Sequence, residues 1–315
     1  MTETPRILCL GAMLWDVIGH SPVPLALGED VAGRIHQRPG GVALNVAVAL
    51  ARQGLSPAIL SAVGRDAPGD ALITETRRLG VVTDWLYRDG PLPTDLYMAI
   101  EAPGGLVAAI ADAHGLEAAG LSILTPLRDG RLGRADAPWR GALVIDGNPT
   151  QDTLALIAAD PCLAAAELRI VPASPDKATR LAPLLAHPRS VFHINRAEAE
   201  ALAGRPLAGS VVAAEAVVAL GALRVIVTDG PRAAADAMQG QPTIAQTPPP
   251  LAAARVTGAG DAFLAAHLAA EMAGAARDAA LTAAIAAASA HVTDTAHVTD
   301  TAHNTNTAHA IDTPA

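Results

Sequence analysis

Short apolar runs bounded by glycine, proline or acidic residues recur along the chain and predict buried strands. The first runs from Arg6 to Gly11, and others lie at 58–63, 81–87, 142–146, 169–172, 191–195 and 223–228. Stretches with helical character lie between several of these runs and stop at glycine, as at Gly54 and Gly80. Alternation of strand and helix is the signature of parallel βαβ units, so the pattern predicts an α/β domain.

Two further extended runs, Thr94–Ile100 and Leu106–Ile110, are joined by a Pro-Gly-Gly turn and predict a β-hairpin. Together with the extended pieces of 17–37, the segment 94–112 predicts a small separate sheet, which would suit a lid. From His291 onward the sequence is a His-, Thr- and Asp-rich repeat without an apolar period. We therefore expect one domain over 1–290 and a low-complexity, disordered tail over 291–315.

Composition excludes some classes of partner. The chain is 51% hydrophobic but only 2% aromatic, so Ala, Val, Leu and Ile must build the core. A net charge of -9 argues against a nucleic-acid surface. Charged residues interrupt the Ala-rich run after Asp261, which makes it a poor membrane span. Cys9 and Cys162 lie in apolar settings and are expected to be buried free thiols, so we expect a cytoplasmic protein that binds neither nucleic acid nor membrane.

The stretch RVTGAGDAFLAAHL, from Arg255 to Leu268, carries the strongest candidate chemistry. Gly258, Ala259 and Gly260 form a small-residue turn, here called the anion turn, that opens directly into a helix. Backbone N–H groups at such a turn point outward at the positive end of the helix dipole and would hold a phosphate oxygen. Asp261 in the first helical turn is either a helix-starting carboxylate or a general base beside the phosphate.

A second group of candidates lies near the N-terminus. Asp16 comes just beyond the first strand, where ligands of open α/β sheets gather, and could accept hydrogen bonds from two sugar hydroxyls. Gly40 and Gly41 form a tight turn that would let a substrate approach the backbone, and Asn45 would face the same site from the following helix. The alternatives are an ordinary turn aspartate and a plain glycine turn before a core helix.

Asn195 and Glu198 lie three apart at a helix entrance. They are either a helix cap with a reciprocal glutamate, or a polar pair that holds water and Mg²⁺ near a nucleotide phosphate.

Three of these motifs resemble those of a known family. GGVALNVAVALARQG (40–54) and VTGAGDAF (256–263) are similar to the two signatures of the ribokinase-like (PfkB) sugar and nucleoside kinases, and NRAE (195–198) to their N-x-x-E motif. The motifs occur in the family's order within residues 6–290. The resemblance implies a three-layer α/β/α fold with a mostly parallel central sheet and a small β-sheet lid. It also implies ATP-dependent phosphorylation of a hydroxymethyl group.

Within that family, IADA (110–113), DGNPTQDTL (146–154) and ASPDKATRL (173–181) are most similar to the pseudouridine kinases. The chain departs from those kinases at Ala113, where they usually carry methionine, and its VTDGPRAA stretch lacks the family's second glycine. The resemblance implies phosphorylation of a nucleoside 5′-hydroxyl, with pseudouridine as the expected substrate. Other kinases of the family, acting on ribose, a ketose phosphate or adenosine, stay open, as does a non-catalytic sugar or nucleoside sensor.

The resemblance also implies roles for individual residues. Asp261 would accept the proton of the substrate hydroxyl, and the anion turn would hold the transferring phosphate. Glu198 would order Mg²⁺ through water. The substrate would be held by Asp16, Gly40, Gly41 and Asn45, with Asp112 reaching in from the lid. The nucleotide would be lined by Asn195, Thr228, Gly230, Gly258 and Gly260. ATP and Mg²⁺ are the implied cofactors, a monovalent cation such as K⁺ stays open, and a homodimer is expected.

Overall fold

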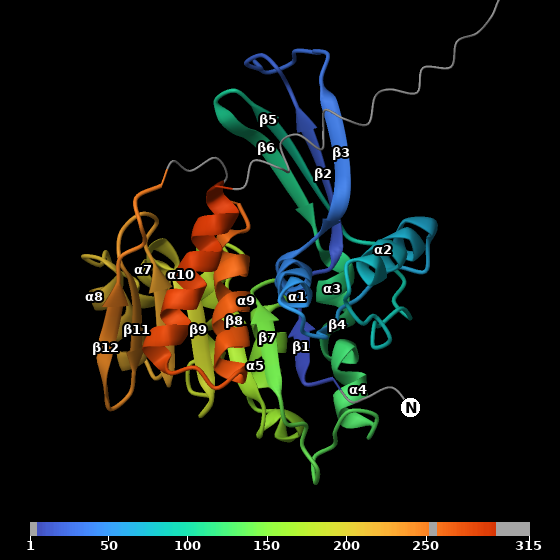
Figure 1. The fold of residues 1–315 in the computed structure, drawn as a ribbon. Helices are drawn as coiled ribbons and strands as arrows, with labels where there is room; N and C mark the ends of the chain where they lie inside the picture. Colours follow the sequence, from blue (N-terminus) through green and yellow to red (C-terminus); the bar gives the residue numbers. More distant parts are fainter. Residues whose placement is uncertain (1–4, 252–256, 294–315) are drawn as a thin grey trace, which may run out of the picture.

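A computed structural model describes residues 5–251 and 257–293, which form a larger and a smaller β-sheet with helices packed on the larger one (Figure 1). The larger sheet has eight strands in the order β12-β11-β10-β9-β8-β7-β1-β4. Their bounds are β1 Ile7–Leu10, β4 Ala58–Leu60, β7 Ala142–Asp146, β8 Glu167–Val171, β9 Ser190–Asn195, β10 Arg224–Thr228, β11 Ala234–Met238 and β12 Gln241–Gln246. The strands from β4 to β10 are parallel, and β11 and β12 add antiparallel pairs at one edge.

Helices cover both faces of this sheet because its strands are apolar on both sides. In β1, Leu8 and Leu10 join the core on one face, while Ile7 and Cys9 join the core on the other. The first face carries α3 His114–Ala119, α4 Thr125–Arg128, α5 Gln151–Ala158, α6 Pro175–Ala178, α7 Arg196–Ala203 and α8 Ser210–Ala219. The second carries α1 Val42–Arg52, α2 Ala67–Arg78, α9 Ala259–Met272 and α10 Arg277–Thr293. The expected three-layer α/β/α fold is confirmed.

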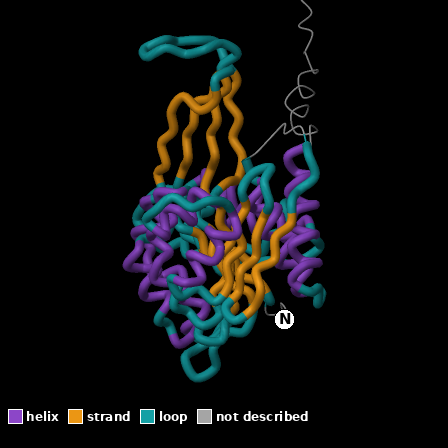
Figure 2. Tube along the Cα trace, turned by 90° about the vertical axis from the view of Figure 1, so that its left-hand side faces the viewer, coloured by secondary structure: helices purple, strands orange, loops and turns teal. Residues whose placement is uncertain are grey.

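The smaller sheet projects from the body of the molecule (Figure 2). Its four strands lie in the order β3-β2-β5-β6. Their bounds are β2 Leu14–His20, β3 Arg34–Gly40, β5 Leu96–Ala102 and β6 Gly105–Asp112. The predicted hairpin is confirmed as β5 and β6, which pair antiparallel. β2 and β3 extend beyond the expected segment 17–37 at both ends.

The structure differs from the sequence expectations at the run 81–87 and at the start of the tail. The run 81–87 is not a full strand, because it makes only isolated bridges at Val82 and Tyr87 beside the edge strand β4. Helix α10 continues to Thr293, past the expected start of the tail at 291. The remaining tail, 294–315, lies outside the described residues, so its expected disorder stays a prediction. Arg255 and Val256 of the kinase-like motif also lie outside the described residues.

Two features of residues 5–251 and 257–293 bear on the expectations from composition. None of the helices in these ranges is both long and apolar enough to cross a membrane. Cys9 and Cys162 are buried and free.

Candidate active site

The parallel strands direct their carboxyl ends to one edge of the larger sheet. Figure 1 shows that the smaller sheet and the start of α9 lie at this same edge. The loops that carry most of the predicted site residues therefore meet there, as ligand-binding loops do in open α/β sheets.

Asp16 belongs to β2 and lies opposite Arg38 of β3, whose Nε is 3.6 Å from Asp16 Oδ2. Burial raises the pKa of the Asp16 carboxyl, and the charge of Arg38 offsets part of that rise. The carboxyl lies over Gly40, where a Cβ would be 2.3 Å from Asp16 Cγ. Gly41 has a φ of 98°, and a Cβ there would lie 2.4 Å from the Ala12 carbonyl oxygen. Both glycines are thus required by the close approach of the protein's own atoms, whereas the expected approach of a substrate to their backbone stays a prediction.

Helices α1 and α9 pack together, and their N-terminal turns meet through Asn45 and Asp261. The side-chain amide of Asn45 faces the Asp261 carboxyl and lowers its pKa. Burial has the larger, opposite effect, and the nearby charges of Asp146 and Glu198 add to it, so the pKa of Asp261 rises to about 7. The structure therefore brings Asp261, Asn45 and Glu198 together.

The anion turn has the geometry of an uncapped helix start. Gly258 is the N-cap of α9, with a φ of 88°, and contributes no capping side chain. The first helical bond runs from the Ala262 N–H to the Gly258 carbonyl, so the preceding N–H groups lack helical acceptors. A Cβ at Gly260 would meet nothing within 4 Å, which leaves room for a ligand. His291 Nε2 lies 2.9 Å from the Thr257 carbonyl oxygen and supports the turn from α10.

Asn195 and Glu198 form a reciprocal helix cap. Glu198 Oε2 accepts a hydrogen bond from the Asn195 backbone N–H at 2.7 Å, and Asn195 Oδ1 accepts one from the Glu198 N–H at 3.0 Å. Burial raises the pKa of Glu198 to about 7. Within the described ranges no side chain or N–H donates to Glu198 Oε1. A buried carboxylate with a spare oxygen and no cation beside it suits a metal held through water, since Mg²⁺ keeps several waters in nucleotide sites.

The other predicted nucleotide residues lie at the end of β10 and just after it. Thr228 is the register partner of Asn195 in β9, so the two lie side by side at the sheet edge. Gly230 has a φ of 58°. Between them, Asp229 is buried and accepts hydrogen bonds from Arg196 and Arg232, which lower its pKa. The described residues include no cluster of three or more His, Cys, Asp or Glu that could bind a metal directly.

Asp112 is not brought to the other predicted residues. It is exposed at the end of β6 and lies 2.7 Å from His114 Nδ1, and this hydrogen bond lowers its pKa. Its row of register partners contains Leu96 and Trp15. Because Asp16 lies one residue further along β2, its side chain points to the opposite face of the smaller sheet.

The sequence analysis missed Asp146 and Asn148 at the end of β7. Asp146 is fully buried, and its Oδ2 accepts hydrogen bonds from Ala12 N at 2.9 Å and Ala43 N at 3.1 Å. Asn148 donates to the same carboxylate through its backbone N–H and through Nδ2. Asp146 thus ties the ends of β1 and β7 to the start of α1. The available signal was a carboxylate at the end of a strand, the same position that singled out Asp16.

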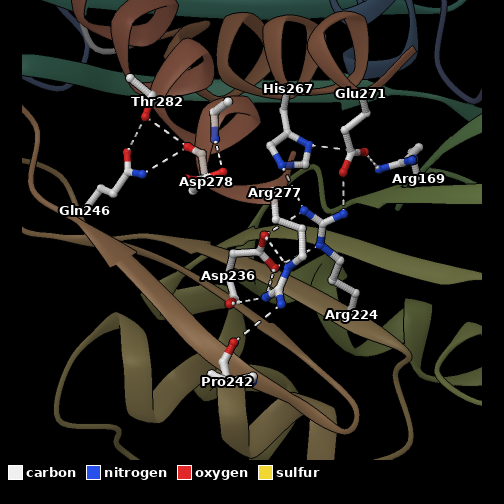
Figure 3. Close-up of polar contacts among 11 residues, drawn as sticks. Arg169, Arg224, Asp236, Pro242, Gln246, His267, Glu271, Arg277, Asp278 and Thr282 are labelled. Carbon is white, nitrogen blue, oxygen red and sulfur yellow. Dashed lines mark hydrogen bonds and ion pairs between the residues drawn. The ribbon is translucent and has the colours of Figure 1, made fainter. Parts of the chain in front are cut away.

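A buried ionic cluster holds α9 on the sheet (Figure 3). Glu271, near the end of α9, accepts a hydrogen bond from Arg169 of β8 at 2.6 Å and also contacts Arg224 of β10. Arg224 Nε donates to Asp236 of β11 at 2.8 Å, and Arg277 of α10 contacts the same carboxylate. Glu271 therefore fixes α9, the helix that begins at the anion turn, to the two strands β8 and β10, and Arg224 links this pair to Asp236 of β11.

The glycine motif of 40–54, an N-x-x-E cap and an anion turn at one edge of this fold are the features of a family of small-molecule kinases. The chain belongs to the pfkB family of carbohydrate kinases, whose model matches residues 4–302. The resemblance stated from the three motifs is thereby confirmed.

Two curated kinases are similar to part of this chain in sequence. The pseudouridine kinase of Escherichia coli (strain K12) is 34% identical over 113 residues, which cover 36% of this chain and 36% of the relative. The uncharacterized sugar kinase YeiI of the same strain is 33% identical over 130 residues, 41% of this chain and 36% of the relative. The chain thus spans about a third of the length of the curated relatives it matches.

Two solved structures are similar over nearly the whole chain. A carbohydrate kinase from Agrobacterium tumefaciens has a TM-score of 0.77 and 27% identity, covering 92% of this chain and 91% of that one. The ribokinase of Arabidopsis thaliana, solved with ribose and ATP, has a TM-score of 0.74 at 21% identity and covers 93% and 94% of the two chains. These likenesses support the ribokinase-like fold.

Proposed function

We propose that this protein is an ATP-dependent kinase that phosphorylates the 5′-hydroxyl of a nucleoside, with pseudouridine as the preferred substrate. The observation that carries the proposal is the position of Asp261. It lies in the first turn of α9, next to the unpaired N–H groups of the anion turn and facing Asn45 of the substrate side.

The reaction divides the work between Asp261 and the anion turn. Asp261 accepts the proton of the substrate hydroxyl while the new O–P bond forms and the bond between the γ-phosphorus and the bridging oxygen of ATP breaks, releasing ADP. A base with a pKa of about 7 suits this step, because it is available near neutral pH and still binds the proton effectively. The N–H groups of the anion turn stabilise the charge on the phosphoryl oxygens.

The substrate and the nucleotide occupy opposite sides of Asp261. Asp16 and Asn45 hold the ribose hydroxyls, against the backbone of Gly40 and Gly41. Asn195, Thr228 and Gly230 line the nucleotide side.

Mg²⁺, held through water by Glu198, neutralises charge on the ATP phosphates when it is bound. A monovalent cation near the anion turn stays a prediction.

The choice of pseudouridine rests on the local sequence similarity to the pseudouridine kinase of E. coli. A sugar kinase is the second candidate, favoured by the similarity to YeiI and to the Agrobacterium carbohydrate kinase. A non-catalytic sensor is disfavoured, because a sensor needs neither a general base nor a metal-ordering glutamate.

An ATP-consumption assay across nucleosides and sugars tests the proposal. We expect kcat/KM for pseudouridine to exceed that for ribose, fructose 6-phosphate and adenosine, with pseudouridine 5′-phosphate as the product. Equal or better turnover of any of those three would reject pseudouridine as the preferred substrate. If none of the four compounds stimulates ATP consumption, the proposed function is rejected.

A further inference from the structure

Lys177 is the only lysine of a chain that carries 22 basic Lys and Arg residues. It follows β8 in the short helix α6 and is partly buried. Lysine and arginine are not equivalent here, because an ammonium is a compact point charge with three rotatable donors, whereas a guanidinium is a planar fork. The sequence thus places its single ammonium at the active-site edge of the sheet.

The ammonium is held by the residues that follow β7. Lys177 Nζ donates to Asn148 Oδ1 at 2.7 Å, and Asn148 Nδ2 donates to Asp146 Oδ2 at 2.8 Å. These two bonds fix the orientation of the Asn148 amide, because its oxygen must face the ammonium and its nitrogen the carboxylate. The cation is therefore positioned by a relay that ends on the carboxylate of Asp146, whose charge raises the pKa of Asp261.

The charge of Lys177 is not neutralised by the protein part that the structure describes. No carboxylate of residues 5–251 and 257–293 lies within ion-pair distance of Nζ. The neighbouring Arg180 differs, since it pairs with Glu117 at 3.0 Å. One of the three ammonium N–H groups is used by Asn148, which leaves two for an anionic ligand.

The position of Lys177 relative to the sheet indicates which anion its ammonium would bind. β7 and β8 lie between β1, which leads into the substrate side, and β9 and β10, which carry the nucleotide side. Three carboxylates lie close together at this edge of the sheet, because Asp146, which ends the hydrogen-bond relay from Lys177, and Glu198 both raise the pKa of Asp261. ATP brings further negative charge to the same place, so an unpaired cation there would lower the electrostatic cost of its γ-phosphate.

We propose that Lys177 is a further catalytic residue, whose ammonium binds a γ-phosphoryl oxygen of ATP and follows it to the substrate. Lys177 keeps its protons throughout, since the hydroxyl proton goes to Asp261 and the bridging oxygen leaves with ADP. Asn148 is the positioning residue that aims the ammonium. This inference rests on the proposed function.

Because the chain has one lysine, the rate at which an amine reagent modifies Lys177 directly reports whether a ligand covers its ammonium. Trace acetylation with an N-hydroxysuccinimide ester, followed by peptide mass spectrometry, reports Lys177 against the α-amino group as an internal reference. With Mg²⁺ and the non-hydrolysable analogue AMP-PNP at ~100 times its Kd, we expect acetylation of Lys177 to slow about tenfold or more, in line with site occupancy. ADP, which lacks the γ-phosphate, should protect much less.

The same experiment separates the inference from the function on which it rests. AMP-PNP binding, measured by calorimetry, without protection of Lys177 would overturn the inference alone. Protection by pseudouridine but not by AMP-PNP would also overturn it, because the ammonium would then bind the acceptor substrate. Absence of AMP-PNP binding would reject the proposed kinase function, and this inference with it.

Variants supply a second measurement. We expect Lys177→Met to lower kcat about 10²-fold, as for loss of one electrostatic donor, while the nucleoside KM changes by less than ~3-fold. Lys177→Arg should recover part of kcat, because it keeps the charge but not the geometry. Arg189→Met is the matched control, since it removes an exposed cation that pairs with Glu167, and it should leave kcat unchanged. A lower thermal midpoint of Lys177→Met with unchanged kcat would show a structural lysine and overturn the inference.

Discussion

At the scale of single residues, the site is dominated by carboxyl groups that are buried, as in Asp146 and Glu198, or half-buried, as in Asp261. Asp261 and Glu198 both have a pKa raised to about 7, in each case mainly by burial. Their charged forms are thus disfavoured in the folded protein, so the stability they contribute is present at low pH and is lost as the pH rises through about 7. A protein tolerates such a cost where the charged form is needed for function, and the roles proposed for Asp261 as proton acceptor and Glu198 as metal-ordering group would both need it.

Glu198→Gln separates the helix-cap role of Glu198 from its proposed metal role. Glutamine can still accept the Asn195 N–H bond, but it cannot offer a charge to Mg²⁺. We expect a higher Mg²⁺ requirement and a lower kcat, with no loss in the free energy of unfolding. Mg²⁺ titrations of turnover and urea unfolding of the same variant check both parts. If the variant loses stability and keeps the parent's Mg²⁺ dependence, Glu198 is only a cap.

At the scale of elements, α9 is held at both ends by different means. Its N-terminal turn faces α1 through Asn45, and its C-terminal part is fixed by the ionic cluster around Glu271. The charges of this cluster partly neutralise one another, because the three guanidinium groups of Arg169, Arg224 and Arg277 share the two carboxylates of Glu271 and Asp236. Breaking it would leave buried guanidinium groups without their partner.

Glu271→Ala tests this anchor. The side chains of Arg169 and Arg224 are 6% and 8% exposed, so loss of their shared carboxylate should cost about 3–5 kcal/mol of unfolding free energy. Glu75→Ala removes an exposed pair with Arg78 and should cost about 0–1 kcal/mol. Urea unfolding of both variants makes the comparison. Equal losses would show that the cluster does not hold α9.

The elements differ in how well the sequence predicts them. Apolar runs and turn residues predict the buried parallel strands and the hairpin. The glycine pair Gly40 and Gly41 indicates a turn in which other atoms approach the backbone closely. The run 81–87 looks like a strand but lies beside the edge strand β4, where few partners are available. No local pattern predicts the ionic cluster, because its members come from β8, β10, β11, α9 and α10 and meet only in the fold.

The site shows the same division. Asp261, Asn45 and the Asn195–Glu198 cap lie in short motifs, and the structure brings them together at one edge. The sequence did not indicate the contacts of Asp146 and Asn148, or the role proposed for Lys177, since these contacts depend on which strands are neighbours in the sheet. Asp112 was expected to reach the substrate, but the alternation of side chains in β6 directs it away from the face of Asp16.

At the scale of the whole molecule, the smaller sheet has an apolar face that residues 5–251 and 257–293 leave uncovered. Ile35, Met98, Ile100 and Ile110 are 77%, 46%, 41% and 69% exposed. The register places them in adjacent rows, out of phase with Asp16, so they share the face opposite to it. A contiguous apolar face of this kind marks an interaction surface.

We propose that this face joins two copies of the chain, and Ile110→Glu tests the homodimer. Light scattering coupled to size exclusion should give twice the chain mass of 31.9 kDa for the parent. Ile110→Glu should give the monomer mass, because a charge in the apolar face opposes pairing. Leu156→Glu, on the exposed side of α5, is the control and should remain a dimer. A monomeric parent, or a dimeric Ile110→Glu, would contradict the proposal.

The central claim is that Asp261 is the general base of phosphoryl transfer, and single-turnover kinetics of Asp261→Asn test it most directly. Asparagine is nearly isosteric and still starts a helix well, so the anion turn should survive and ATP should still bind. The parent rate should fall as the pH drops below about 7, the pKa of Asp261, because the protonated carboxyl cannot accept a proton. The variant should be slower by about 10²–10⁴ at pH 8 and should lack this pH dependence. A variant rate within a factor of ~10 of the parent, with ATP affinity preserved, would contradict the account, because loss of a general base costs more than that.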